Sequence, residues 1–154
     1  MRIVRGMAAA ALLAAGAAQA QAGADAARVA FQRDFCHGLK RLLREAPDYA
    51  GMYNAHPAPP WLGFRPGACR AYAGTEKYPA AYDCHQHLAP AHLSLETLAS
   101  ATAECLPEAE RTRGRWGRDV TFTLPGGRIL ISESGGPRAK VGRIVGYRVE
   151  AVAD

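Results

Sequence analysis

The chain has 154 residues, of which 49% are hydrophobic and 21% charged, and its formal net charge is +5. This length is typical of one domain that buries about two thirds of its unfolded surface. A chain of this length therefore does not depend on disulfide bonds as its only source of order.

Residues 1–20 have the three parts of a secretory signal peptide. Two arginines lie near the start, residues 7–18 form an apolar run (MAAAALLAAGAA), and the sequence Ala-Gln-Ala precedes the expected cleavage point. A second Ala-Gln-Ala ends two residues later and offers an alternative cleavage point. The apolar run is shorter than the roughly 20 residues of a membrane span. We predict that residues 1–20 are a cleaved signal peptide and that residues 21–154 form a single domain.

Export would place the mature protein in the periplasm or outside the cell, with no transmembrane segment after cleavage. Loss of Arg2 and Arg5 lowers the formal charge from +5 to +3. Export and this small charge together argue against nucleic acid as a partner. In an oxidising compartment, the four cysteines are expected to form disulfide bonds.

The first predicted element of the mature chain is a helix from Asp25 to Ala46. At helical spacing one side of this segment is apolar and the other is charged. Pro47 ends it, because the residue before a proline disfavours the helical region. The expected buried face consists of Val29, Phe31, Phe35, Cys36, Leu39, Leu42, Leu43 and Ala46.

Residues 47–68 form a predicted loop that is rich in proline and glycine, with no regular element across most of its length. Four aromatic residues are scattered through it, so we expect the loop to pack onto the domain through their side chains. They are Tyr49, Tyr53, Trp61 and Phe64.

A hairpin and a second helix follow. Residues 69–73 and 80–87 are predicted strands joined by a six-residue turn segment. The second helix is predicted to begin at Ser94, which can cap its first turn, and to end before Pro107. Its expected buried face consists of Leu95, Leu98, Thr102, Cys105 and Leu106.

The last part of the chain alternates apolar and polar residues, which predicts strands. Residues 120–124 and 128–133 flank a Pro-Gly-Gly turn, and residues 145–151 form a third strand. The apolar run at 129–131 predicts that the middle strand is covered on both faces. The expected fold class is α+β, with two helices packed on an antiparallel sheet in the order helix, hairpin, helix and three-stranded meander.

Four cysteines allow three pairings. In the predicted hairpin, Cys69 lies opposite Cys84, and facing Cβ atoms about 4.5–5.5 Å apart can form a bridge with modest adjustment. Cys36 and Cys105 then remain, each on the apolar face of its helix. We predict the pairs Cys69–Cys84 and Cys36–Cys105.

The sequence Asp83-Cys84-His85-Gln86-His87 is a candidate metal site. On a strand, Asp83, His85 and His87 share one face, and two histidines with a carboxylate are ligands for zinc or copper. His56 or His92 could complete the site. The alternative interpretation is a set of exposed polar residues on the solvent face of an edge strand, with no cofactor bound.

A second candidate site is the basic segment RTRGRWGR, where a tryptophan lies among arginines. Such a segment can bind an anionic surface by charge and stacking. Acidic residues flank it and weaken its field, so the alternative interpretation is a solvated linker. The candidate anion-binding residues are Arg111, Arg113, Arg115, Trp116 and Arg118.

Catalytic signals are weak throughout the sequence. There is no GxSxG elbow, and Ser100, Ser132 and Ser134 have no evident histidine partner. The sequence therefore favours an exported, non-catalytic binding or interaction protein, whose partner is an unidentified protein or envelope component. A periplasmic metal-binding protein is the alternative, and a small secreted enzyme of unassigned reaction is a weaker one.

Overall fold

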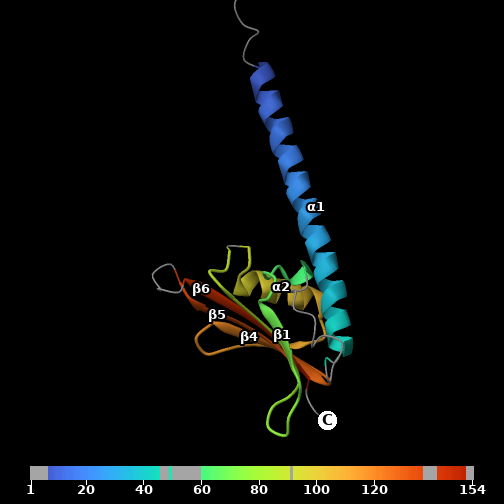
Figure 1. The fold of residues 1–154 in the computed structure, drawn as a ribbon. Helices are drawn as coiled ribbons and strands as arrows, with labels where there is room; N and C mark the ends of the chain where they lie inside the picture. Colours follow the sequence, from blue (N-terminus) through green and yellow to red (C-terminus); the bar gives the residue numbers. More distant parts are fainter. Residues whose placement is uncertain (1–6, 46–48, 50–59, 91, 137–141, 152–154) are drawn as a thin grey trace, which may run out of the picture. The chain divides into compact units, whose positions relative to one another are not determined.

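The structure is a computed structural model that describes residues 7–45, 49, 60–90, 92–136 and 142–151, with side chains from residue 21 onward (Figure 1). Its contacts divide the chain into two units, Met1–Asp34 and Phe35–Asp154. Helix α1 (Met7–Glu45) runs through both. The second unit contains the remaining elements and the core.

Helix α1 begins earlier than predicted, because the alanine-rich leader is itself a strong helix former. The predicted apolar face is only partly buried. Phe35, Leu39 and Leu42 are fully buried, whereas the exposed fractions of Val29 and Phe31 are 68% and 36%. The prediction that Val29 and Phe31 are buried was wrong, because helical spacing shows which side chains share a face but not how far along the helix that face is covered. Ala46 lies outside the described residues.

Six antiparallel strands form one sheet in the order β1-β2-β6-β5-β4-β3. They are β1 (Cys69–Tyr72), β2 (Ala81–His87), β3 (Glu110–Arg113), β4 (Asp119–Leu124), β5 (Gly127–Gly135) and β6 (Arg143–Ala151). The predicted α+β class is confirmed. The predicted strand count and order differ, because β3 was interpreted as a linker and because β2 pairs with β6, which joins the hairpin and the meander into one sheet.

Helix α2 (Leu95–Cys105) begins where its capping signal predicted. The Ser94 side chain accepts a hydrogen bond from the Thr97 backbone N–H at 3.1 Å. This bond satisfies one of the amides that a helix leaves unpaired at its start. Leu98 and Thr102 on the same helix are fully buried. The cap therefore sets the point at which α2 crosses the inner face of the sheet.

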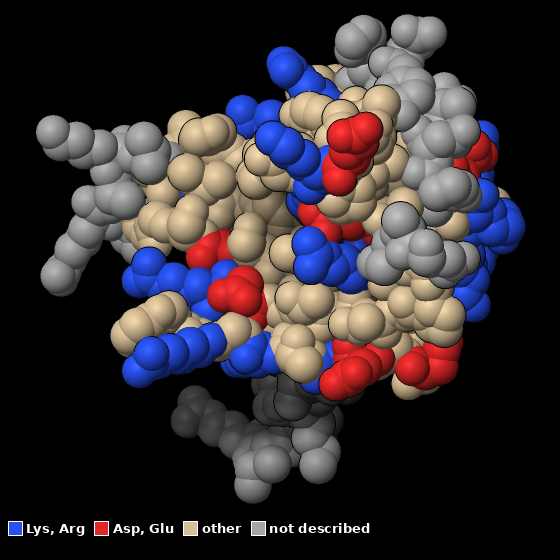
Figure 2. Space-filling view, turned by 90° about the horizontal axis from the view of Figure 1, so that it is seen from below, with Lys and Arg blue, Asp and Glu red and all other residues tan. Residues whose placement is uncertain are grey.

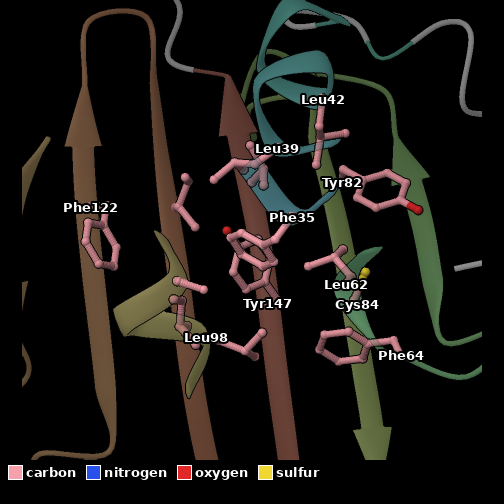
Figure 3. Packing of buried hydrophobic residues seen from close by; sticks show 14 of the residues in the cluster. Phe35, Leu39, Leu42, Leu62, Phe64, Tyr82, Cys84, Leu98, Phe122 and Tyr147 are labelled. Carbon is pink, nitrogen blue, oxygen red and sulfur yellow. The ribbon is translucent and has the colours of Figure 1, made fainter. Parts of the chain in front are cut away.

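The core lies between this inner face and the two helices (Figure 3). Alternate residues of β6, Val145, Tyr147 and Val149, are fully buried and point into it. The Phe35 ring of α1 meets the Tyr147 ring edge to face, with ring centroids 6.1 Å apart. In β5 the alternation is retained, with Ile129 and Ile131 buried and the intervening Leu130 half-buried on the other face.

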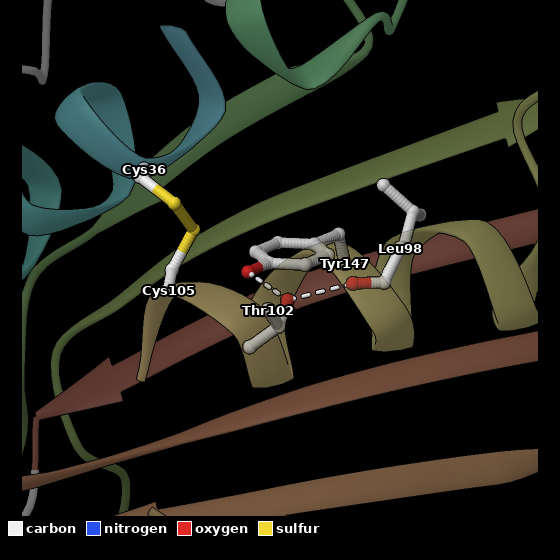
Figure 4. Close-up of a disulfide and its surroundings, with 5 residues drawn as sticks. All are labelled: Cys36, Leu98, Thr102, Cys105 and Tyr147. Atoms are coloured by element: carbon white, nitrogen blue, oxygen red, sulfur yellow. Dashed lines mark hydrogen bonds between the residues drawn. A yellow bond between two sulfur atoms is a disulfide. The ribbon is translucent and has the colours of Figure 1, made fainter. Parts of the chain in front are cut away.

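A buried hydrogen-bond chain connects α2 to β6 (Figure 4). The Thr102 hydroxyl donates to the Leu98 carbonyl at 2.8 Å, and the Tyr147 hydroxyl is 3.0 Å from the Thr102 oxygen. Since the Thr102 proton is used on the carbonyl, Tyr147 is the donor in the second bond. Burial, which outweighs this bond, raises the pKa of Tyr147 well above its ordinary value. Tyr147 therefore remains a neutral donor over the physiological pH range.

The two disulfides are those predicted. Cys36 of α1 is bonded to Cys105 at the end of α2, and Cys69 of β1 is bonded to Cys84 of β2. The β1–β2 register places Cys69 directly opposite Cys84, as the hairpin model required. One bridge thus closes a local hairpin, and the other joins two helices that are 69 residues apart in sequence.

The described part of the proline-rich loop packs on the core, in agreement with its aromatic content. Tyr49 and Phe64 are buried, and a short 3-10 helix, η2 (Pro60–Leu62), carries the half-buried Trp61. Burial raises the pKa of Tyr49 to about 12, with a smaller contribution from the Glu150 carboxylate. Residues 47–48 and 50–59, which include Tyr53 and His56, lie outside the described residues.

Gly38 provides a test of this packing. It is buried near the C-terminal end of α1, and a Cβ added there would overlap the Trp61 ring. Alanine at an open helical glycine stabilises by roughly 1 kcal/mol. At Gly38 we expect the opposite sign, a loss of about 1–2 kcal/mol in the free energy of unfolding, because overpacking displaces Trp61.

Urea denaturation of Gly38→Ala measures this loss. Gly23→Ala is the matched control on the same helix, since nothing lies within 4 Å of a Cβ at that position. If Gly23→Ala does not lower the free energy of unfolding and Gly38→Ala does, the contact between Gly38 and Trp61 is confirmed. Equal gains at both positions would contradict it.

Candidate functional site

The outer face of the sheet is the face opposite α2 and the core. The candidate residues Asp83, His85 and His87 lie on it, and Cys84 lies on the inner face, as strand alternation predicted. The edge-strand interpretation of β2 was wrong, because β2 lies between β1 and β6. Asp83 is flanked on both sides, by Arg70 of β1 and Arg148 of β6, whereas His85 and His87 lie beyond the residues that pair with β1.

Asp83 belongs to an ion-pair network across β2, β6 and β5. Arg148 lies 3.4 Å from one carboxylate oxygen of Asp83 and 2.5 Å from Glu150, and Arg128 pairs with the other oxygen of Glu150. Nε2 of His85 is 3.1 Å from Oδ1 of Asp83, without the alignment of a hydrogen bond. The Asp83 carboxylate is thus held mainly by an arginine.

The same arginines control the ionisation of Glu150. Burial alone would raise the pKa of this carboxyl group. Hydrogen bonds from Arg128 and Arg148, together with their positive charge, outweigh burial and hold the pKa of Glu150 below its ordinary value. In the view from below, acidic and basic side chains are interspersed and do not gather by sign (Figure 2). The two arginines and the two carboxylates of this network therefore neutralise one another's charge.

A metal site requires several ligands that converge on one point. Among the described residues, no group of three or more His, Cys, Asp or Glu side chains is arranged to hold a metal ion. Asp83 and His85 are in contact, whereas His87 and His92 are exposed. His56, the other histidine considered as a ligand, lies outside the described residues.

The register reveals one neighbour of His85 that the sequence did not. His85, Gly146 and Ser132 form one row across β2, β6 and β5. A Cβ at Gly146 would lie 2.7 Å from the Ser132 hydroxyl oxygen and 3.2 Å from Nδ1 of His85, so the two side chains flank the glycine. They make no hydrogen bond with each other in the described structure, and a serine without a bonded base is not an activated nucleophile.

The five residues of the basic segment have two separate environments. Arg111 and Arg113 lie on β3, with their side chains on the inner side of the sheet. The Arg111 guanidinium is 5.8 Å from the centre of the Phe122 ring, and Arg113 forms an ion pair with Glu96 of α2. Arg111 thus borders the core at Phe122, and Arg113 is engaged in an exposed ion pair.

The other three residues belong to the hairpin tip, which we define as residues 114–118 between β3 and β4. Its backbone is held by two hydrogen bonds, from the Gly114 N–H to the Asp119 carbonyl and from the Gly117 N–H to the Gly114 carbonyl. Gly117 has a φ of 65°, which favours glycine. Trp116 is consequently presented to solvent with an exposed fraction of 78%.

The arginines of the hairpin tip are available to a ligand. The Arg115 guanidinium lies 5.3 Å from the centre of the Trp116 ring, which is a cation–π distance. Neither Arg115 nor Arg118 forms an ion pair with a carboxylate of the described residues, and both are exposed. The nearby Asp119 carboxylate lies over the backbone of Gly114.

Two shallow hollows meet at Arg118. One, of about 420 Å³, is lined by Trp116, Arg118 and Asp119. The other, of about 290 Å³, lies between the hairpin tip, the start of α2 and the end of β5. Glu133 lines the second hollow, but its carboxylate accepts a hydrogen bond from the Leu95 N–H at 2.9 Å. The sequence could not indicate this hollow, since its walls come from three distant segments.

No family model, curated protein or solved structure matches this chain. Within the described part of the chain, every helix falls short of the length and hydropathy that a membrane span requires. The assignment of function therefore rests on the geometry of the hairpin tip and of the outer face.

Proposed function

We propose that the protein is an exported, non-catalytic binding module that recognises an anionic partner with its hairpin tip. One observation carries this proposal. The exposed Trp116 contacts Arg115 and lines one hollow together with Arg118, which also lines a second hollow, and neither arginine has a carboxylate partner among the described residues. The ring that Arg115 contacts is exposed, whereas Arg111 lies over the buried Phe122 and Arg113 pairs with Glu96.

The chemistry of the hairpin tip suits anions. Guanidinium groups donate up to five hydrogen bonds in a planar fork that matches carboxylate and phosphate oxygens. An indole ring adds apolar contact area and one N–H donor. Glu96 is paired with Arg113 and Glu133 accepts a hydrogen bond from the Leu95 N–H, whereas the Asp119 carboxylate lines one hollow beside Arg118 without an ion pair among the described residues. An anionic group at Arg118 would therefore compete mainly with Asp119.

Export is part of the same proposal. The leader pattern of residues 1–20 motivates it, and two disulfides are consistent with an oxidising compartment. Partners in such a compartment include proteins and components of the cell envelope. A metal-binding role is less favoured, because the Asp83 carboxylate is paired with Arg148.

Binding to two anionic probes tests the function. We would measure the affinity of the mature protein for a polyaspartate peptide and for vesicles that contain phosphatidylglycerol. The wild type should bind at least one of them, with an affinity that falls as salt is added. The double variant Arg115→Gln/Arg118→Gln should bind that probe at least about tenfold more weakly, because two charge contacts are lost.

The β1–β2 turn supplies the matched control. It lies at the other end of the sheet and also presents a cation and an exposed aromatic residue, Lys77 and Tyr78, the latter with an exposed fraction of 69%. The variant Lys77→Gln/Tyr78→Ala should bind as the wild type does. The proposal would be overturned if the wild type bound neither probe. It would also be overturned if the control variant lost as much affinity as the double arginine variant.

A further inference from the structure

We propose that the anionic partner is the surface of a lipid membrane, an inference that rests on the proposed function. A second exposed apolar side chain leads to it. Leu88, which directly follows β2, has an exposed fraction of 64%. Strand pairing places it at the same end of the sheet as Trp116, because His87 is opposite Ile144, Ile144 is opposite Ser134, and β4 begins beside the end of β5.

The two apolar side chains are separated across the sheet. Leu88 follows β2 and Trp116 precedes β4, and two strands, β6 and β5, lie between them. At about 4.8 Å per strand spacing, the three spacings from β2 to β4 amount to roughly 14 Å. A small ligand in either hollow could not contact both. A larger surface that meets this end of the sheet could contact both side chains.

Leu88 is held in its exposed position by the fold. Its φ of 51° is in the left-handed region, and its side chain lies over Gly142. The next residue, Ala89, donates its N–H to the Arg143 carbonyl at 3.0 Å, and the Arg143 guanidinium donates back to the Ala89 carbonyl at 3.0 Å. The backbone after β2 is therefore fixed, and Leu88 remains outside the core.

Lipid fits this combination better than an acidic peptide does. At a membrane interface, indole rings lie at the level of the headgroups, leucine side chains enter the acyl boundary, and arginines bind the phosphates. A peptide added as a strand beside β3 would instead use Arg111 and Arg113. Those side chains are already engaged with Phe122 and Glu96.

The fluorescence of Trp116 tests the inference directly. The chain has two tryptophans, so Trp61→Phe makes Trp116 the only one. Vesicles of phosphatidylglycerol and phosphatidylcholine should shift its emission to shorter wavelength and protect it from iodide, and vesicles of phosphatidylcholine alone should not. Arg115→Gln and Arg118→Gln should each weaken partitioning by about fivefold, the share of one arginine near an anionic surface. Leu88→Ala should weaken it by a similar factor.

Each outcome decides between the proposals. If polyaspartate binding depends on Arg115 and Arg118 while anionic vesicles leave Trp116 unchanged, the partner is an acidic protein, and only the lipid inference is wrong. If neither probe binds, both proposals are wrong. Equal binding to both kinds of vesicle would also overturn the inference. Co-sedimentation of the wild type with the same vesicles gives the answer if Trp61→Phe fails to fold.

Discussion

Replacing Phe35 by alanine is expected to lower the free energy of unfolding by about 3–5 kcal/mol. Phe35 is fully buried, and its ring makes edge-to-face contacts with Trp61 and Tyr147 at centroid distances of 5.6 Å and 6.1 Å. Such aromatic pairs contribute roughly 0.5–1.5 kcal/mol each beyond the area they bury. Because three elements meet at this ring, the cavity cannot close by the movement of one side chain.

The matched control for Phe35 lies six residues earlier on the same helix. Val29 has an exposed fraction of 68%, so Val29→Ala should change the free energy of unfolding by less than about 0.5 kcal/mol. The loss in the free energy of unfolding for Phe35→Leu should lie between those for Val29→Ala and Phe35→Ala. This variant keeps the test informative if Phe35→Ala does not fold. Similar losses at Val29 and Phe35 would show that the buried face of the helix extends to Val29, as the sequence had predicted.

Removing the Cys36–Cys105 bridge is expected to lower the free energy of unfolding by about 4 kcal/mol. The bridge spans 69 residues, and in the chain-entropy model a longer closed loop restricts the unfolded chain more strongly. The variant is Cys36→Ala/Cys105→Ala, since serine would place a hydroxyl group in the core. Urea denaturation of protein with and without the bridge measures the loss.

The second bridge provides the comparison for the first. Cys69 and Cys84 are 15 residues apart, so Cys69→Ala/Cys84→Ala should cost about 3 kcal/mol on the same model. The difference between the two losses is more informative than either alone, because both variants remove two buried sulfur atoms. A larger loss for the hairpin bridge would contradict the entropic explanation and indicate that packing dominates.

Local signals predicted much of the fold. Ser94 at the start of α2 and the alternation of Val145, Tyr147 and Val149 each depend on neighbours within a few residues, and the structure agrees with them. Strand β3 left no such signal, because its sequence, ERTR, has no apolar residue and all four of its residues are exposed. It becomes a strand by pairing with β4, and that pairing depends on the sheet already being present.

The candidate sites were predicted less well than the fold. Strand alternation correctly placed Asp83, His85 and His87 on one face, but it could not indicate that Arg148, 65 residues away, would pair with Asp83. The arginine cluster was a valid signal of charge. Only its contacts showed that Arg111 and Arg113 are engaged with Phe122 and Glu96 while the arginines around Trp116 have no carboxylate partner in the described chain.

The sequence by itself determined the α+β class, the helix cap and the facing positions of Cys69 and Cys84, because turn composition, periodicity and spacing act over short distances along the chain. The pair Cys36–Cys105 followed only as the two cysteines that remained. Only the tertiary structure decided the β2–β6 pairing, the extent of the buried face of α1 and the division of the arginine cluster. Each of these depends on contacts between segments far apart in sequence, and a local pattern gives no information about which distant segment will supply the partner.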